Sequence, residues 1–203
     1  MDTIKYQLNA RRQPYGQGAD LILLNESVGN EVLAFHQKFP DYRVTPLRKL
    51  EFLSQRLGLG SIHIKDEAQR FGLNAFKGLG GSYAMGKYLA ALLERDINTL
   101  SFAELNSPVI KARIKDIVFV TATDGNHGRG VAWAAEQLGL RAVVYMPKGS
   151  SPVRAQNIRR HGAECTITEL NYDDTVRLAA KTAREQGWVL LQDTAWQGYE
   201  QIP

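Results

Sequence analysis

Four short apolar runs, separated by helical patterns, restrict the fold of this chain more than any other feature. The runs are rich in β-branched and aromatic residues and lie at 117–120, 142–146, 165–167 and 188–191. Apolar residues at helical spacing occur between them, at 131–138, 153–160 and 176–183. Repeated strand–helix–strand units predict an α/β fold in which right-handed crossovers place helices on both faces of a parallel sheet. Ligands of such folds bind beyond the carboxyl ends of the strands.

The first half of the chain shows a less regular pattern. Residues 1–30 are rich in turn-forming types and indicate an irregular lead-in. The patterns that follow predict a helix at 31–39, an extended stretch around the prolines, a helix at 47–57, a buried strand at 62–65, and an amphipathic helix from Gly78 onward. A polar stretch at 94–108 then leads into the first apolar run.

Composition excludes several classes of protein. The 203 residues are 44% hydrophobic, which is ample for a packed core, and the net charge of +4 comes from dispersed residues, so we expect no nucleic-acid partner. No segment has the length and apolar character of a membrane span, and the start does not read as an export signal. The single Cys165 favours a reducing compartment, and we expect a cytoplasmic protein. Neither this cysteine nor the spacing of the four histidines indicates a metal site.

Lys77 lies at a predicted junction between a loop and a helix, among small residues. Most lysines are solvated surface residues, and this reading is the simpler one. However, the neighbouring Phe76 can shield the amine from water, and a helix N-terminus disfavours a nearby cation. Both effects favour a neutral amine, which is the form that attacks a carbonyl group to give an imine.

A second polar segment follows the first apolar run directly and contains Thr123, Asp124, Gly125, Asn126 and His127. Asp and Asn often cap helices, so the segment can be an ordinary strand-to-helix turn. Alternatively, the free N–H groups at the start of the next helix bind a carboxylate or phosphate.

A third polar position, Asp193, follows the last apolar run. Because it falls at the carboxyl end of a strand, as Asp124 does, the two carboxylates together would suit a cationic substrate.

Taken in order along the chain, these segments resemble the fold-type II pyridoxal-phosphate enzymes and, within them, the diaminopropionate ammonia-lyases. Motifs such as Thr45-Pro46-Leu47 and Phe76-Lys77 are weak alone, but the whole set covers most of the chain. The matching segments are 43–47, 65–67, 70–77, 123–135, 145–149, 171–178 and 192–196.

The resemblance implies roles for the site residues. Lys77 would hold pyridoxal phosphate as an imine, with Asn126 at the phenolic oxygen of the cofactor and with Phe76 and Gly125 beside it. Lys77 and Asp124 would be the catalytic bases for the L and D isomers. The residues implied in substrate binding are Thr123, Asp124, His127 and Asp193.

The reaction implied is the elimination of ammonia from 2,3-diaminopropionate, which yields pyruvate and ammonia, in a homodimer with the tryptophan synthase β-like architecture. Residues 1–96, rejoined by 193–203, would begin the large cofactor-binding domain, and 97–192 would form the smaller parallel α/β domain. Members of the family are longer, so the resemblance implies truncation at the C-terminal side and an incomplete second domain. The alternatives are another fold-type II eliminase, such as a serine or threonine dehydratase, and a truncated fragment without catalytic activity.

Overall fold

A four-stranded parallel sheet forms the centre of the molecule. The computed structural model describes residues 9–11, 25–200 and 202. Within them, the strand order is β5-β4-β3-β6, and all neighbouring pairs are parallel. The strands are β3 (Val118–Ala122), β4 (Arg141–Met146), β5 (Glu164–Ile167) and β6 (Val189–Leu190). They coincide with the four apolar runs, so the predicted parallel sheet is confirmed.

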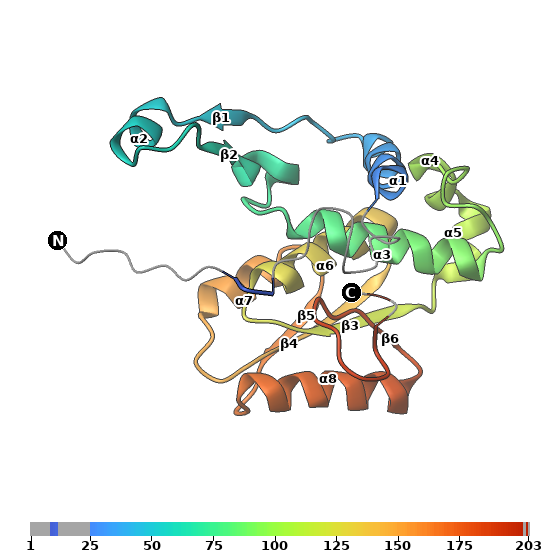
Figure 1. Ribbon diagram of the computed structural model, residues 1–203. Helices are drawn as coiled ribbons and strands as arrows, with labels where there is room; N and C mark the ends of the chain where they lie inside the picture. Colours follow the sequence, from blue (N-terminus) through green and yellow to red (C-terminus); the bar gives the residue numbers. More distant parts are fainter. Residues whose placement is uncertain (1–8, 12–24, 201, 203) are drawn as a thin grey trace.

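Helices cover both faces of this sheet (Figure 1). On one face lie α6 (Asn126–Leu138) and α7 (Pro152–Arg159), and α3 (Lys77–Leu92) packs on α6 as a further layer. On the other face lies α8 (Tyr172–Gln186), which contacts β3, β4 and β6. The predicted helices at 131–138, 153–160 and 176–183 correspond to α6, α7 and α8.

Alternation along the strands divides the core into two parts. Phe119 and Val144 belong to the larger cluster, between the sheet and the layer of α6 and α3. Val120 and Val143 belong to the smaller cluster with Ala179 of α8. Successive side chains of a strand point to opposite faces, so a sheet covered on both sides needs apolar residues at every position.

An arm extends from this body (Figure 1). It consists of the antiparallel strands β1 (Leu47–Lys49) and β2 (His63–Lys65), with α2 (Glu51–Arg56) between them. The helix predicted at 47–57 therefore begins only at Glu51, because its first residues pair with β2. The strand predicted at 62–65 is shorter, and the three residues of β2 are exposed rather than buried, since β2 belongs to a two-stranded pair and not to the central sheet.

The remaining elements surround α3. Helix α1 (Glu26–Gln37) starts earlier than predicted because the side chain of Asn25 caps it by accepting from the N–H of Val28. Two helices that were not predicted, α4 (Phe102–Leu105) within the polar stretch and α5 (Pro108–Ile114) from its end, are each capped by a serine. A short 3-10 segment, η2 (Glu67–Gly72), precedes α3. The predicted lead-in at 1–30 lies largely outside the described residues.

The larger core cluster crosses the predicted domain boundary between residues 96 and 97. It runs from Phe35 in α1 to Leu191 after β6. The division into two domains stays a prediction.

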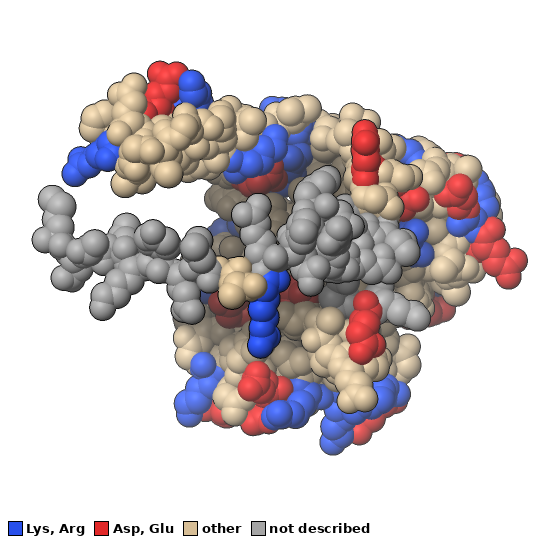
Figure 2. All heavy atoms as spheres, in the orientation of Figure 1, with Lys and Arg blue, Asp and Glu red and all other residues tan. Residues whose placement is uncertain are grey.

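Charges of both signs are mixed on the described surface. On the face shown in Figure 2, basic and acidic side chains alternate along the lower edge of the molecule, where α8 lies. No described helix has the combination of length and apolar character that a membrane span requires.

Candidate functional site around Lys77

Lys77 is the first residue of α3 and lies where α3 crosses α6. A Cβ atom placed on Gly130 of α6 would be 2.6 Å from the carbonyl oxygen of Lys77 and 2.9 Å from the backbone nitrogen of Gly78. Only a glycine permits two backbones to approach so closely. The crossing therefore fixes the backbone of Lys77 against the first turns of α6.

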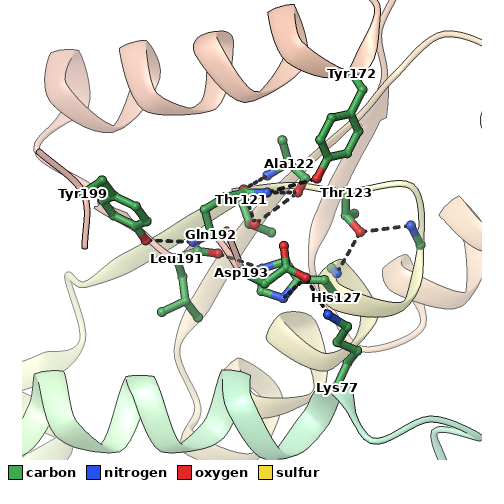
Figure 3. Close-up of polar contacts among 12 residues, drawn as sticks. Lys77, Thr121, Ala122, Thr123, His127, Tyr172, Leu191, Gln192, Asp193 and Tyr199 are labelled. Atoms are coloured by element: carbon green, nitrogen blue, oxygen red, sulfur yellow. Dashed lines mark hydrogen bonds and ion pairs between the residues drawn. The ribbon is translucent and has the colours of Figure 1, made fainter. Parts of the chain in front are cut away.

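The amine of Lys77 is paired with a carboxylate from the far end of the chain. Its Nζ donates to Oδ2 of Asp193 at 2.7 Å, and the lysine side chain is 35% exposed (Figure 3). Nζ also lies 5.5 Å from the ring centroid of Phe76, and the aromatic face attracts a cation. The side chain of Phe76 is itself mostly exposed. The amine therefore faces a carboxylate and an aromatic ring, and the shielding expected from Phe76 is incomplete because that ring is itself exposed.

Asp193 is ionised in this setting. Partial burial is the largest single effect and would raise the pKa of its carboxyl, but the hydrogen bond from Lys77, together with the charges of Lys77 and His127, holds that pKa below the ordinary value. Asp193 is thus the nearest described group that can take up a proton when Lys77 loses one.

His127, in the first turn of α6, connects this pair to the sheet. It is 8% exposed, and its Nε2 lies 2.8 Å from the carbonyl oxygen of Leu191. A carbonyl oxygen can only accept, so Nε2 carries the proton. Nδ1 lies 3.7 Å from Oδ2 of Asp193. Burial lowers the pKa of His127 despite this carboxylate, so the neutral ring is favoured and serves as an anchor for the strand end.

Two residues that the sequence reading missed hold the backbone next to Asp193. The buried side chain of Gln192 accepts from Thr121 Oγ1 and from the N–H of Ala122, each at 3.1 Å, and donates to the carbonyl of Ala122 at 3.0 Å. The hydroxyl of Tyr199 bonds the backbone on the opposite side of the segment (Figure 3). The available signal was a glutamine directly after an apolar run, where a buried polar group needs partners.

The loop before α6 contains the other predicted site residues. Oγ1 of the buried Thr123 accepts from the N–H groups of Gly125 at 2.9 Å and of Gly128 at 3.2 Å, so this side chain organises the loop. Asn126 is exposed at the first position of α6. The Asp124 carboxylate is 77% exposed and lies 3.7 Å from Nη1 of Arg154, which also donates to the Asp124 carbonyl.

A cavity of about 190 Å³ opens beside Lys77. Four of the predicted site residues line it: Phe76, Lys77, His127 and Asp193. The other four, Thr123, Asp124, Gly125 and Asn126, lie on the neighbouring loop and are not part of its lining. Among the described residues there is no cluster of three or more His, Cys, Asp or Glu side chains that could hold a metal ion.

This arrangement, with a lysine at a helix start and a carboxylate at the carboxyl edge of a parallel sheet, matches a known class of enzyme. The family model for pyridoxal-phosphate-dependent enzymes matches residues 38–202. The chain belongs to this family.

Among its relatives, the chain is similar to the diaminopropionate ammonia-lyases. It is 76% identical over 202 residues to that of Salmonella typhimurium, and 46% identical over 203 residues to that of Escherichia coli K12. Both matches include 100% of this chain and 50% of the relative. The chain thus spans about half the length of these curated relatives. The L-threonine dehydratase of Salmonella typhimurium is 32% identical over 166 residues, which are 79% of this chain and 28% of that protein.

Solved structures agree with these matches. The apo form of Escherichia coli diaminopropionate ammonia lyase superposes with a TM-score of 0.83 and 51% identity, over 90% of this chain and 49% of that one. The same enzyme in complex with an aminoacrylate-PLP azomethine reaction intermediate gives a TM-score of 0.81 and 50% identity, over 90% and 45%. The architecture is that of the fold-type II pyridoxal-phosphate enzymes, as predicted.

Proposed function

We propose that the whole protein catalyses the pyridoxal-phosphate-dependent elimination of ammonia from D- and L-2,3-diaminopropionate, giving pyruvate and ammonia. One observation carries the proposal: Lys77 extends its amine into a cavity at the carboxyl edge of the sheet, 2.7 Å from Asp193. The 76% identity with an enzyme named for this reaction supports the choice of substrate.

The residues present fit the cofactor. Lys77 would hold it through Nζ, and Gly125 and Asn126 lie at the N-terminus of a 13-residue helix, which favours an anion or a ring oxygen. Phe76 would lie beside it. When bound, the cofactor supplies an electron sink for the pair of electrons left at Cα after deprotonation.

The side chains of this chain would then move protons and orient the substrate. We assign proton removal from Cα of the L isomer to Lys77 and from the D isomer to Asp124, one from each face. Asp193 takes up the proton that Lys77 must lose before its nitrogen can form a bond, and its charge attracts the amino groups of the substrate. After the β-amino group leaves as ammonia, the released enamine hydrolyses in water to pyruvate and a second ammonia.

Cofactor attachment is tested on the purified chain with added pyridoxal phosphate. Absorbance is recorded, borohydride is added to fix any covalent attachment, and the modified residue is mapped by mass spectrometry. We expect modification of Lys77, none in Lys77→Ala, and an unchanged result in Lys87→Ala, which removes a lysine from the same helix that pairs with Glu31 instead. A folded chain that is modified equally at many lysines would contradict the proposal.

Substrate choice is tested on the whole protein. We expect ammonia release from 2,3-diaminopropionate to exceed release from serine or threonine, because a hydroxyl leaving group brings no second cation to the carboxylates. A preference for threonine would indicate the dehydratase reaction instead. No product from any of these amino acids, with cofactor bound, would contradict the elimination chemistry.

For the whole protein we further propose a cytoplasmic homodimer in which residues 1–96 and 193–203 belong to the cofactor-binding domain. The mass of the whole protein, measured by light scattering, tests the homodimer. Proteolytic cleavage around residue 96 tests the division into domains.

A further inference from the structure

We propose that Tyr199 is a positioning residue: its hydroxyl fixes the backbone after β6 and thereby holds the Asp193 carboxylate against Lys77. The meaning of this clamp for catalysis rests on the proposed function of Lys77. The clamp itself is defined by contacts within this chain.

The clamp occupies the free edge of the sheet. Strand β6 is the last strand of the order β5-β4-β3-β6, so one of its edges has no neighbouring strand within the described structure. Tyr199 donates its hydroxyl proton to the carbonyl of Leu190 at 3.0 Å and accepts from the N–H of Gln192 at 2.8 Å. One hydroxyl thus satisfies two backbone groups that a neighbouring strand would otherwise pair.

The opposite edge of the same segment is held by different groups. The N–H of Leu191 donates to the carbonyl of Val120 at 2.9 Å, and the carbonyl of Leu191 accepts from His127. The Gln192 side chain is bonded to the end of β3. Asp193 is the next residue, so its side chain is attached to a backbone that is held from both sides. Its carboxylate points toward Lys77 (Figure 3).

Tyr199 is itself held in place by a tight turn. The backbones of Trp196 and Tyr199 exchange two hydrogen bonds, of 3.2 and 2.8 Å, and the two rings stack with centroids 4.4 Å apart. Burial raises the pKa of the Tyr199 hydroxyl, so it remains protonated and able to donate at neutral pH. This turn, at 196–199, carries no residue in the lining of the cavity beside Lys77. Tyr199 thus acts on Lys77 only through the backbone and Asp193.

The test uses the cofactor-free chain and measures the reactivity of Lys77. A small acylating reagent is applied in trace amounts, and labelling of each lysine is quantified by mass spectrometry. Tyr199→Phe keeps the ring and removes both hydroxyl bonds. We expect Lys77 to be acylated about twofold to fivefold faster in this variant, because the Asp193 carboxylate holds Nζ less firmly and the amine is more often free to meet the reagent. Labelling of the other lysines should not change.

Two further variants separate positioning from general loosening. Tyr83→Phe also removes a partly buried tyrosine hydroxyl, one that bonds Glu31 away from Asp193, and we expect it to leave Lys77 labelling unchanged. In an Asp193→Asn background, Tyr199→Phe should add nothing, because the carboxylate that the clamp positions is already gone. Equal labelling of Lys77 in wild type and Tyr199→Phe, or an additive effect in the double variant, would overturn the proposal.

Hydrogen exchange of the wild-type chain gives a test that needs no variant. The backbone amide of Gln192 should exchange about tenfold or more slowly than an exposed loop amide, because it donates a hydrogen bond to the Tyr199 hydroxyl. Exchange at the rate of an open loop would show that no clamp exists. Since neither measurement uses pyridoxal phosphate, failure of the chain to bind the cofactor would affect the proposed function and leave this inference intact.

Discussion

Replacing Gly130 by alanine should destabilise the protein by forcing apart the crossing that positions Lys77. The added Cβ would lie 2.6 Å from the Lys77 oxygen, 2.7 Å from its carbonyl carbon and 2.9 Å from the Gly78 nitrogen. All three are backbone atoms, so no side chain can rotate away. Reaching ordinary contact requires a shift of about 0.8 Å between helices that pack at normal interior density.

The size of the effect follows from two opposing terms. Overpacking costs about 1–3 kcal/mol, and the rigid surroundings place this site in the upper part of that range. Alanine in a helix interior is more favourable than glycine by about 1 kcal/mol of helix propensity. We therefore expect the free energy of unfolding to fall by about 1–2 kcal/mol, measured by urea unfolding followed by far-UV circular dichroism, and we expect Lys77 acylation to change.

Gly80 offers a matched control on the partner helix. It lies in α3, and a Cβ placed on it would have no heavy atom within 4 Å. Gly80→Ala should therefore stabilise the chain by about 0.5–1 kcal/mol through helix propensity alone. If Gly130→Ala were as stable as Gly80→Ala, the close approach of α3 and α6 would not be real, and the argument about how Lys77 is positioned would be refuted.

Three other perturbations test the loop and the anchor next to it. In the whole protein, Asp124→Asn should lower turnover of the D isomer about 100-fold or more, and turnover of the L isomer much less, since loss of a general base lowers the rate about 10²–10⁴-fold. Equal losses for the two isomers in a steady-state assay would contradict the assigned roles. Thr123→Val leaves the N–H groups of Gly125 and Gly128 without their acceptor and should lower the free energy of unfolding by about 1–3 kcal/mol in urea, a loss that Thr123→Ser should largely avoid. His127 has a pKa below its unfolded value of 6.5, so the unfolded chain binds the proton first and stability falls as the pH drops below about 6.5; His127→Gln should flatten that part of the pH–stability curve, and an unchanged slope would contradict the burial argument.

The parallel sheet was predictable because each strand is buried on both faces. A strand such as β3, buried at all five positions, is apolar except at Thr121, whose hydroxyl bonds Gln192, and this produces a nearly continuous run that the sequence reveals. The helices between the runs bury one stripe each, which gives the 3.6-residue pattern. Local composition was sufficient for these elements.

The arm could not be predicted in the same way. Leu47–Lys49 forms a strand only because residues 63–65 lie beside it, and that pairing depends on a contact between segments rather than on either sequence alone. Several apolar residues of the arm are exposed. The prediction of a buried strand assumed that apolar residues are buried, and this assumption fails in the arm.

The site was predicted as a set of residues and not as a set of contacts. Lys77 and Asp193 are 116 positions apart, and no local pattern indicates that their side chains meet. The same holds for Tyr199, whose hydroxyl acts on backbone groups that carry no sequence signal. What the sequence could indicate was the edge of the sheet at which Asp124 and Asp193 both emerge.

The structure distinguishes these two carboxylates, which the sequence treats alike. Asp193 is 26% exposed and held between Lys77 and the strand end, while Asp124 is 77% exposed and pairs, within the described part of the chain, with Arg154 at the surface. An ion pair between exposed groups is worth about 0–1 kcal/mol, so little free energy holds Asp124 in its present position. Under the proposed function, Asp193 therefore suits a fixed task next to Lys77. Under the same proposal, Asp124 suits a task that begins only when a cationic substrate arrives and replaces Arg154 as its partner.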